Sequence, residues 1–130
     1  MRFDHCSFQE CGIARFLSLL DGPWATLIVR ELLKGPHRFN ELLESLPGIS
    51  AHTLTNRLRK FVTAGLVTRT AFAEIPPRVV YELTPTGHSL GPVLEAMNEW
   101  ALTVPASVFD ADGGDNTDED NTTRAAAGAL

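Results

Sequence analysis

At 130 residues, with 44% hydrophobic and 21% charged residues, the chain has the size and composition of one small globular domain. No apolar run approaches the roughly 18 residues that a membrane-spanning helix needs. Residues 1–20 contain Asp4 and Glu10 but no small-residue cleavage site, which argues against a signal peptide. Two cysteines, Cys6 and Cys11, are too few for a disulfide framework, so we expect a cytoplasmic protein without membrane contact.

The net charge of −5 is unevenly distributed along the chain. Residues 1–104 contain ten acidic and ten basic side chains, whereas residues 105–130 contain six acidic side chains and only Arg124. The excess negative charge therefore belongs to the C-terminal segment, and residues 1–104 are neutral. A neutral domain lacks the basic excess typical of strong nonspecific DNA binders, so an interpretation as a DNA-binding protein depends on where the charges lie.

The first half of the chain predicts four helices. Gly12–Leu20 has apolar residues at spacings of three and four, which is typical of an amphipathic helix. Trp24–Leu33 has an apolar stripe too broad for a surface helix, so we expect it to be the central core helix. Phe39–Leu46 predicts a short amphipathic helix. Ser50 is a good N-cap for the next helix, which is expected to end at a glycine cap, Gly65.

The second half predicts a hairpin, a long helix and a tail. Leu66–Phe72 and Val79–Leu83 are expected to be strands, and Pro76-Pro77 excludes ladder pairing at the tip between them. A last helix is expected to start at Thr84-Pro85 and to run to about Val104. Asp110–Leu130 is rich in Gly, Asp, Asn and Thr and then in alanine, which predicts disorder, and we assign residues 105–130 to an acidic, disordered tail.

This order of elements predicts an α+β, mainly helical fold. A helix followed by a strand, a wing and a strand is the order of a winged helix-turn-helix. We assign this domain to residues 11–104, with an N-terminal arm over residues 1–10. The first and last helices are predicted to serve in dimerisation.

The helix that begins after Ser50 has one apolar and one polar face. With Leu54 at zero and about 100° per residue, Leu58, Phe61 and Val62 fall within about 80° of it and are expected to point inward. The opposite face then carries His52, Asn56, Arg59 and Lys60.

Such a polar face suits a DNA major groove. Asn can pair with adenine, and Arg or Lys can bind guanine or phosphate. His52 and Asn56 near the N-terminal end are the expected base readers, and Thr53 and Thr55 are expected to contact phosphates. The helix N-terminus at Ser50 is itself a small anion site. The alternative is a polar face that is only solvated.

Two arginines bracket the hairpin tip. These are Arg69 and Arg78, and an arginine there can reach the adjacent minor groove or its phosphates. The alternatives are that Arg78 is an ordinary surface charge and that Arg69 pairs within the hairpin.

The sequence resembles the HxlR-type (DUF24) branch of bacterial winged-helix transcription regulators over roughly residues 11–103. The matching pieces, in order, are Cys11, thirteen residues before Trp24, then Trp24–Leu33, Gly35–Leu42 (GPHRFNEL), Leu46–Ser50 (LPGIS), Leu54–Arg59 (LTNRLR), Gly65–Arg69 (GLVTR), Pro76–Val79 (PPRV), Tyr81, Leu83–Pro85 and Gly87. The resemblance implies a homodimeric, double-stranded DNA-binding regulator of a neighbouring gene, with a dimer built from the first and last helices. Pro23 stands where the family usually has a basic residue, away from the DNA-reading helix.

The composition of the two outer helices independently favours a homodimer. Met97 and Trp100 on a long C-terminal helix need a partner surface that a domain of this size does not supply. Two DNA-reading helices about 34 Å apart would then read a pseudo-palindrome. The alternative is that the last helix packs within its own monomer. The predicted interface residues are Ile13, Phe16, Leu17, Leu94, Met97, Trp100 and Ala101.

Cys11 lies just before the first predicted helix, and a helix N-terminus stabilises a thiolate. In the family that the chain resembles, the cysteine at this position serves in some members as a redox or electrophile sensor. Cys11 is therefore the candidate sensor, with Cys6 as a candidate disulfide partner. The alternative is a small residue packed at the dimer interface. His5, Cys6 and Cys11 supply only three irregularly spaced ligands, so we predict no metal site.

Three other functions are weighed against DNA binding. No Gly-rich phosphate loop, HExxH or GxSxG is present, so neither an enzyme nor a cofactor is predicted. A winged-helix protein-interaction module is the main alternative, although its binding face would be expected to expose aromatic or leucine side chains. A regulator gated by a small ligand, in a pocket near Trp24 and Trp100, is the other. The acidic tail would compete with DNA or keep the protein soluble.

Overall fold

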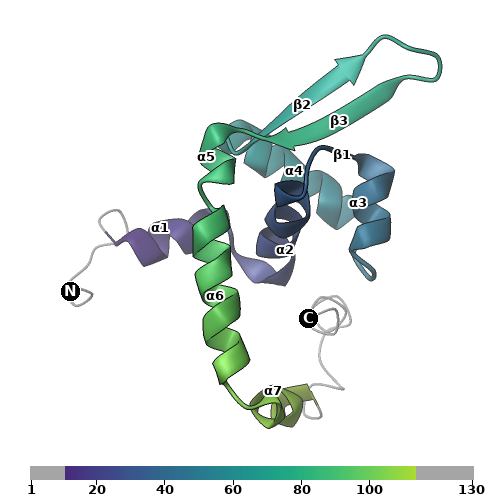
Figure 1. The fold of residues 1–130 in the computed structure, drawn as a ribbon. Coiled ribbons are helices and arrows are strands. Elements are labelled where there is room, and N and C mark those ends of the chain that lie inside the picture. The colour runs from purple at the N-terminus through teal and green to yellow at the C-terminus, as the bar shows by residue number, and fades with distance from the viewer. Residues whose placement is uncertain (1–10, 114–130) are drawn as a thin grey trace.

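The computed structural model describes the backbone of residues 11–113 and the side chains of residues 11–110. The elements in chain order are α1 (Gly12–Leu19), α2 (Gly22–Leu33), β1 (His37–Arg38), α3 (Phe39–Ser45), α4 (Ala51–Ala64), β2 (Val67–Phe72), β3 (Arg78–Leu83), α5 (Pro85–His88), α6 (Gly91–Thr103) and α7 (Ala106–Gly113). A hairpin projects from one end of the helical body, and α6 carries α7 away from it at the other (Figure 1). The predicted α+β, mainly helical winged-helix fold is confirmed.

The hydrophobic core lies where α2, α3 and α4 meet the root of the hairpin. As predicted, α2 is the central core helix, and Ala25, Ile28 and Val29 are fully buried. From α4, Leu54, Leu58 and Phe61 complete the core. Val62 is 37% exposed, so its predicted inward position is wrong. At about 80° from Leu54 it lies at the edge of the buried face, where it lines a cleft between α4 and the hairpin.

The sheet has three antiparallel strands in the order β1-β3-β2. β2 and β3 pair from Val67 opposite Leu83 to Phe72 opposite Arg78, which confirms the predicted hairpin. β1 was not predicted. It consists of two residues, with His37 opposite Tyr81, and a strand this short carries no periodicity of its own.

The turn from β3 into α5 packs closely against the base of the hairpin. Thr84 donates a hydrogen bond from Oγ1 to the carbonyl of Gly65 at 2.6 Å and accepts one from the backbone N–H of Gly87 at 3.1 Å. Gly87 is buried, and a Cβ there would collide with the carbonyl oxygen of Leu66 and lie 2.8 Å from Cδ2 of Leu83. Only a residue without a side chain therefore fits at this position.

The predicted last helix is divided in two. Instead of one helix from Thr84-Pro85 to Val104, α5 ends at His88 and α6 starts at Gly91. Pro92 lies in the first turn of α6, where its missing N–H costs nothing, but it could not donate to a carbonyl of a continuous helix.

Part of the predicted disordered tail is helical. Ala106–Gly113 forms α7, so the expectation of disorder is wrong for these residues. Pro105 directly precedes this helix, and its carbonyl accepts the hydrogen bond from the N–H of Val108 at 3.0 Å. The remaining tail, residues 114–130, and the predicted N-terminal arm, residues 1–10, lie outside the described residues.

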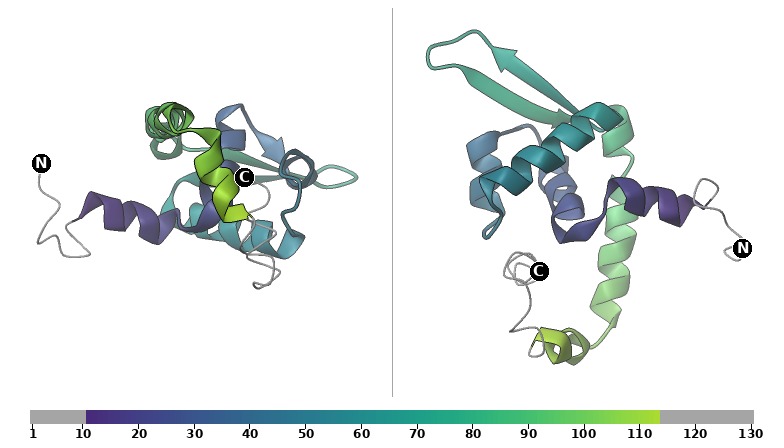
Figure 2. Two further views of the ribbon diagram at one scale, coloured as in Figure 1. Left: turned by 90° about the horizontal axis from the view of Figure 1, so that it is seen from below. Right: turned by 180° about the vertical axis from the view of Figure 1, so that it is seen from behind.

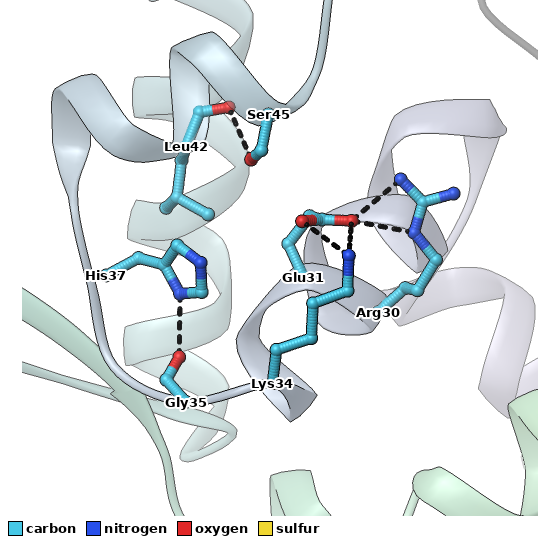
Figure 3. A network of polar contacts seen from close by, with 7 residues as sticks. All are labelled: Arg30, Glu31, Lys34, Gly35, His37, Leu42 and Ser45. Atoms are coloured by element: carbon cyan, nitrogen blue, oxygen red, sulfur yellow. Dashed lines mark hydrogen bonds and ion pairs between the residues drawn. The ribbon is translucent and has the colours of Figure 1, made fainter.

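Glu31 is a buried carboxylate on α2, with 4% of its side chain exposed. Figure 3 shows it between Arg30 and Lys34, which donate hydrogen bonds to it at 2.9 and 3.0 Å. Burial by itself raises the pKa of Glu31, but the hydrogen bonds from Lys34 and Arg30 outweigh burial and hold this pKa below its usual range. The charged network fixes the end of α2 next to the loop that leads to β1.

Among residues 11–113, no single helix is both long and apolar enough to span a membrane. α1 and α2 meet the criteria of length and composition only as a pair bent by 85°, and α2 is the core helix.

Candidate nucleic-acid interface

α4 begins and ends on strong local signals. Ser50 is its N-cap, as predicted: its Oγ accepts a hydrogen bond from the N–H of Thr53 at 3.0 Å and donates one to Oγ1 of Thr53 at 2.9 Å. Gly65 caps the other end in the left-handed conformation, with φ of 82°. The buried residues Leu54 and Leu58 fix the rotation of the helix, so that its polar face points away from the body.

The exposed face of α4 carries His52, Asn56 and Arg59. Nδ2 of Asn56 lies 3.1 Å from Nε2 of His52, one helical turn away, and donates to it when His52 carries its proton on Nδ1. The second amide hydrogen and Oδ1 of Asn56 remain available. These are the two groups that a bidentate contact to adenine requires.

Lys60 follows Asn56 by one helical turn on α4 and is also exposed, but it makes contacts within its own chain. Its Nζ donates to the carbonyl of Ser18, near the end of α1, at 2.9 Å and lies 3.5 Å from Oδ1 of Asp21. The structure therefore ties Lys60 to the corner between α1 and α2, a contact that the helical wheel alone does not reveal.

Arg57 also binds Asp21, and it is a site residue that the sequence analysis did not select. Its Nη1 donates to Oδ1 of Asp21 at 2.7 Å. The hydrogen bond from Arg57 lowers the pKa of Asp21. Gly22 makes room, since a Cβ there would lie 3.0 Å from Nη2 of Arg57. Arg57 and Asp21 are 36 positions apart in the chain, so no local sequence pattern predicts this ion pair.

Arg78 is the predicted wing residue, and it is held at the end of the hairpin. Its Nη2 and Nε donate to Glu74 at 2.7 and 3.2 Å, and its guanidinium lies 3.8 Å from the ring centroid of Phe72. The hydrogen bond from Arg78 lowers the pKa of Glu74. This contact fixes the guanidinium at the tip of the projecting hairpin.

The predicted interface residues are only partly covered. Phe16 and Leu94 pack against the core of their own chain. The exposed fractions are 52% for Ile13, 53% for Leu17, 47% for Met97 and 68% for Trp100, and Ala101 is half-buried. α1 and α6 both extend from the body (Figure 2), and each therefore leaves apolar side chains uncovered.

The two tryptophans do not line a common pocket: Trp24 lies in the core, whereas Trp100 lines a shallow apolar pocket on α6 with Ala96, Met97 and Ala101. Another groove, of about 510 Å³, lies between α2 and α6 and is lined mainly by apolar residues that include Leu27, Leu33 and Leu94.

Cys11 is half-buried at the N-cap of α1, as expected from the sequence. Its candidate partner Cys6 and the third member of the weighed metal set, His5, lie outside the described residues. Within residues 11–113, no three His, Cys, Asp or Glu side chains are placed to hold a metal ion.

Comparisons with known proteins agree with this geometry. Residues 19–106 match the family described as HxlR-like helix-turn-helix. An uncharacterised HTH-type transcriptional regulator of Synechocystis sp. is 48% identical over 89 residues, which make up 68% of this chain and 66% of that protein. The matched part is thus just under two thirds of that relative.

Two solved structures share the fold. The redox regulator HypR in its oxidised form has 32% sequence identity and a TM-score of 0.68, and the match covers 73% of this chain and 98% of HypR. The quinone-bound form of YodB from Bacillus subtilis has 34% identity and a TM-score of 0.64, over 72% of this chain and 99% of YodB. The chain belongs to the HxlR-like helix-turn-helix family of transcriptional regulators.

Proposed function

We propose that the chain is a sequence-specific regulator that binds double-stranded DNA as a homodimer, with α4 in the major groove. The observation that carries the proposal is the exposed His52–Asn56–Arg59 face of α4, which lies beside a projecting hairpin whose Arg78 is fixed at its tip. Ser50, Thr53 and Thr55 lie at the start of α4 and are assigned to the DNA backbone. Lys60 has contacts within its own chain and is assigned a secondary, electrostatic role.

The homodimer rests on the uncovered apolar side chains of α1 and α6, which would form its interface. A soluble monomer rarely leaves Ile13, Leu17, Met97 and Trp100 exposed together. A two-fold axis through this interface would place two α4 helices about one DNA turn apart, so the operator would be a pseudo-palindrome. This arrangement requires a cytoplasmic protein with access to the chromosome.

Selection from a random duplex library with the full-length protein tests the proposal. We expect an inverted repeat with half-sites roughly 10 base pairs apart, centre to centre. A protein-interaction module without DNA affinity would enrich no sequence. The polar character of the α4 face argues against that alternative, because protein-binding surfaces expose aromatic side chains at their centre.

Asn56→Ala is expected to weaken binding to the selected operator by about 1–3 kcal/mol and to relax base preference at one position in each half-site. The reason is the loss of a bidentate base contact. Fluorescence anisotropy with the operator and its single-base variants measures both effects. Asn98→Ala on α6 is the matched control and should bind as wild type. An equal loss of affinity for unrelated DNA would show that Asn56 reads no base.

Cys11 is the second element of the proposal, as the site of an oxidant or electrophile signal. Its position at the N-cap of α1 and the likeness to the redox regulator HypR and to quinone-bound YodB support it. Cys11 caps α1, and α1 also carries the proposed interface residues Ile13 and Leu17 and the carbonyl of Ser18 that Lys60 contacts. A change at Cys11 could therefore act on the dimer surface and on α4 through one helix. A ligand in the groove between α2 and α6 is the alternative signal.

Cys11→Ser is expected to abolish the response to thiol reagents while leaving basal DNA affinity unchanged. The wild-type protein should change its operator affinity at least several-fold after treatment with diamide or a quinone, because modification alters the start of α1. Gel shifts after mass-spectrometric confirmation of the modification measure this. Cys6→Ser separates the two thiols. Unchanged affinity with Cys11 fully modified would refute the sensor.

A further inference from the structure

A cleft of about 320 Å³ with both polar and apolar walls lies between α4 and the hairpin. Its walls are Thr55, Leu58, Arg59, Val62 and Thr63 from the helix, and Arg69 and Tyr81 from β2 and β3. It adjoins the exposed face of α4, since Arg59 belongs to both.

The strand register explains why Arg69 lies in this cleft. Arg69 is directly opposite Tyr81, one pair of inward positions beyond Val67 and Leu83. Val67 and Leu83 are 2% and 5% exposed, and side chains two positions apart point to the same side of a strand. Arg69 therefore occupies a position on the core-facing side of the hairpin, where strand alternation favours an apolar residue.

The cleft has positive charge without a counter-ion. Both of its cations are arginines, and no acidic side chain lines it. Within the described residues, neither the Arg59 side chain nor the Arg69 side chain makes a hydrogen bond or an ion pair. Arg57 and Arg78, by contrast, are each bound to a carboxylate in the same part of the molecule.

These groups match a phosphate. Two guanidinium groups supply charge and paired N–H donors, for which phosphate oxygens are the usual acceptor. The hydroxyl groups of Thr55, Thr63 and Tyr81 add donors on the walls. Phosphate contacts fix the orientation of a protein on the duplex without reading its sequence.

We propose that this cleft binds one backbone phosphate of duplex DNA, held between Arg59 and Arg69, and so sets the distance between the reading helix and the wing. The inference rests on the proposed DNA-binding function and extends it to residues that face inward on the hairpin. Arg69 is a positioning residue here, because it contacts the backbone and leaves the choice of base to α4.

The test compares Arg69→Gln, Arg69→Lys and wild type by measuring affinity against salt concentration. Each lost phosphate contact reduces the slope of log affinity against log salt by about 0.9, so a dimer of Arg69→Gln should lose roughly two. Affinity should fall several-fold for the operator and for scrambled DNA alike. Arg69→Lys keeps the charge and should keep the slope. Arg15→Gln, an exposed charge on α1, is the control and should leave the slope unchanged.

Phosphate ethylation interference locates the contact. Wild type should show one ethylation-sensitive phosphate per half-site that becomes insensitive in Arg69→Gln, with thermal unfolding of the variant unchanged. An unchanged slope and footprint in Arg69→Gln, with wild type bound to its operator, would overturn the phosphate site alone. A loss confined to the operator would make Arg69 a base reader and overturn it too. Wild-type protein that binds no duplex would overturn the proposed function itself.

Discussion

Gly87→Ala is expected to destabilise the fold by about 3 kcal/mol or more. A Cβ at this position would collide with the backbone carbonyl of Leu66 and lie 2.8 Å from the side chain of Leu83. Because one of these neighbours is backbone, relief requires α5 to move off the hairpin root. That movement would break the contact between the N–H of Gly87 and Oγ1 of Thr84.

Urea denaturation followed by circular dichroism measures the loss. Gly91→Ala is a matched control from the next helix, because its Cβ would lie 3.6 Å from Cδ2 of Leu33, an ordinary contact. This control should be neutral or slightly stabilising. Equal stability of the two variants would mean that the turn into α5 adapts without cost.

Trp100→Ala is expected to convert the proposed dimer to a monomer at micromolar concentration. Trp100 is 68% exposed in the single chain, in a row with Val93 and Met97 along α6. A buried interface tryptophan commonly contributes about 2 kcal/mol or more to the free energy of association. In a two-fold symmetric dimer the substitution removes two such tryptophans, one from each subunit. The dissociation constant of the dimer should therefore rise roughly a thousandfold, which is about 4 kcal/mol.

Sedimentation velocity over a dilution series measures the oligomeric state, and gel shifts measure the coupled loss of operator affinity. Leu102→Ala serves as a control, because Leu102 is also exposed but lies about 200° around the helix from Trp100. A wild-type protein that stays monomeric at high concentration would refute the homodimer. An unchanged dissociation constant in Trp100→Ala would move the interface away from α6.

The sequence alone was sufficient to predict the helix caps, the core helix and the hairpin, because each of these has a strong local signal. Ser50 and Gly65 cap α4 as predicted, and the breadth of the apolar stripe identified α2 as the core helix. These features depend on neighbouring residues in the chain, so periodicity and capping preferences reveal them. The hairpin followed from two strand-like runs around Pro76-Pro77.

The features that the sequence did not predict are of two kinds. Some depend on contacts between segments that are distant in the chain, and others are short segments whose composition differs from that of their surroundings. β1 forms because it pairs with β3, which follows it by about 40 residues in the chain. The Lys60 side chain is positioned by its contacts with Ser18 and Asp21, which are also distant in sequence. α7 is eight residues long, and the Gly- and Asp-rich residues that follow obscured it. The cleft at Arg69 was also out of reach, since the sequence left open whether this side chain pairs within the hairpin.

Asp21 has a consequence for how the protein would search a chromosome. Its carboxylate is shared by Arg57 and Lys60, so two of the three Lys or Arg side chains on α4 are already partly neutralised. A genome offers millions of wrong sites, and attraction to all of them scales with the charge that a protein presents. A domain whose cations are occupied internally spends less time on arbitrary DNA. Discrimination then comes from the few groups that remain unoccupied, and the neutral charge of residues 1–104 is an advantage for selectivity.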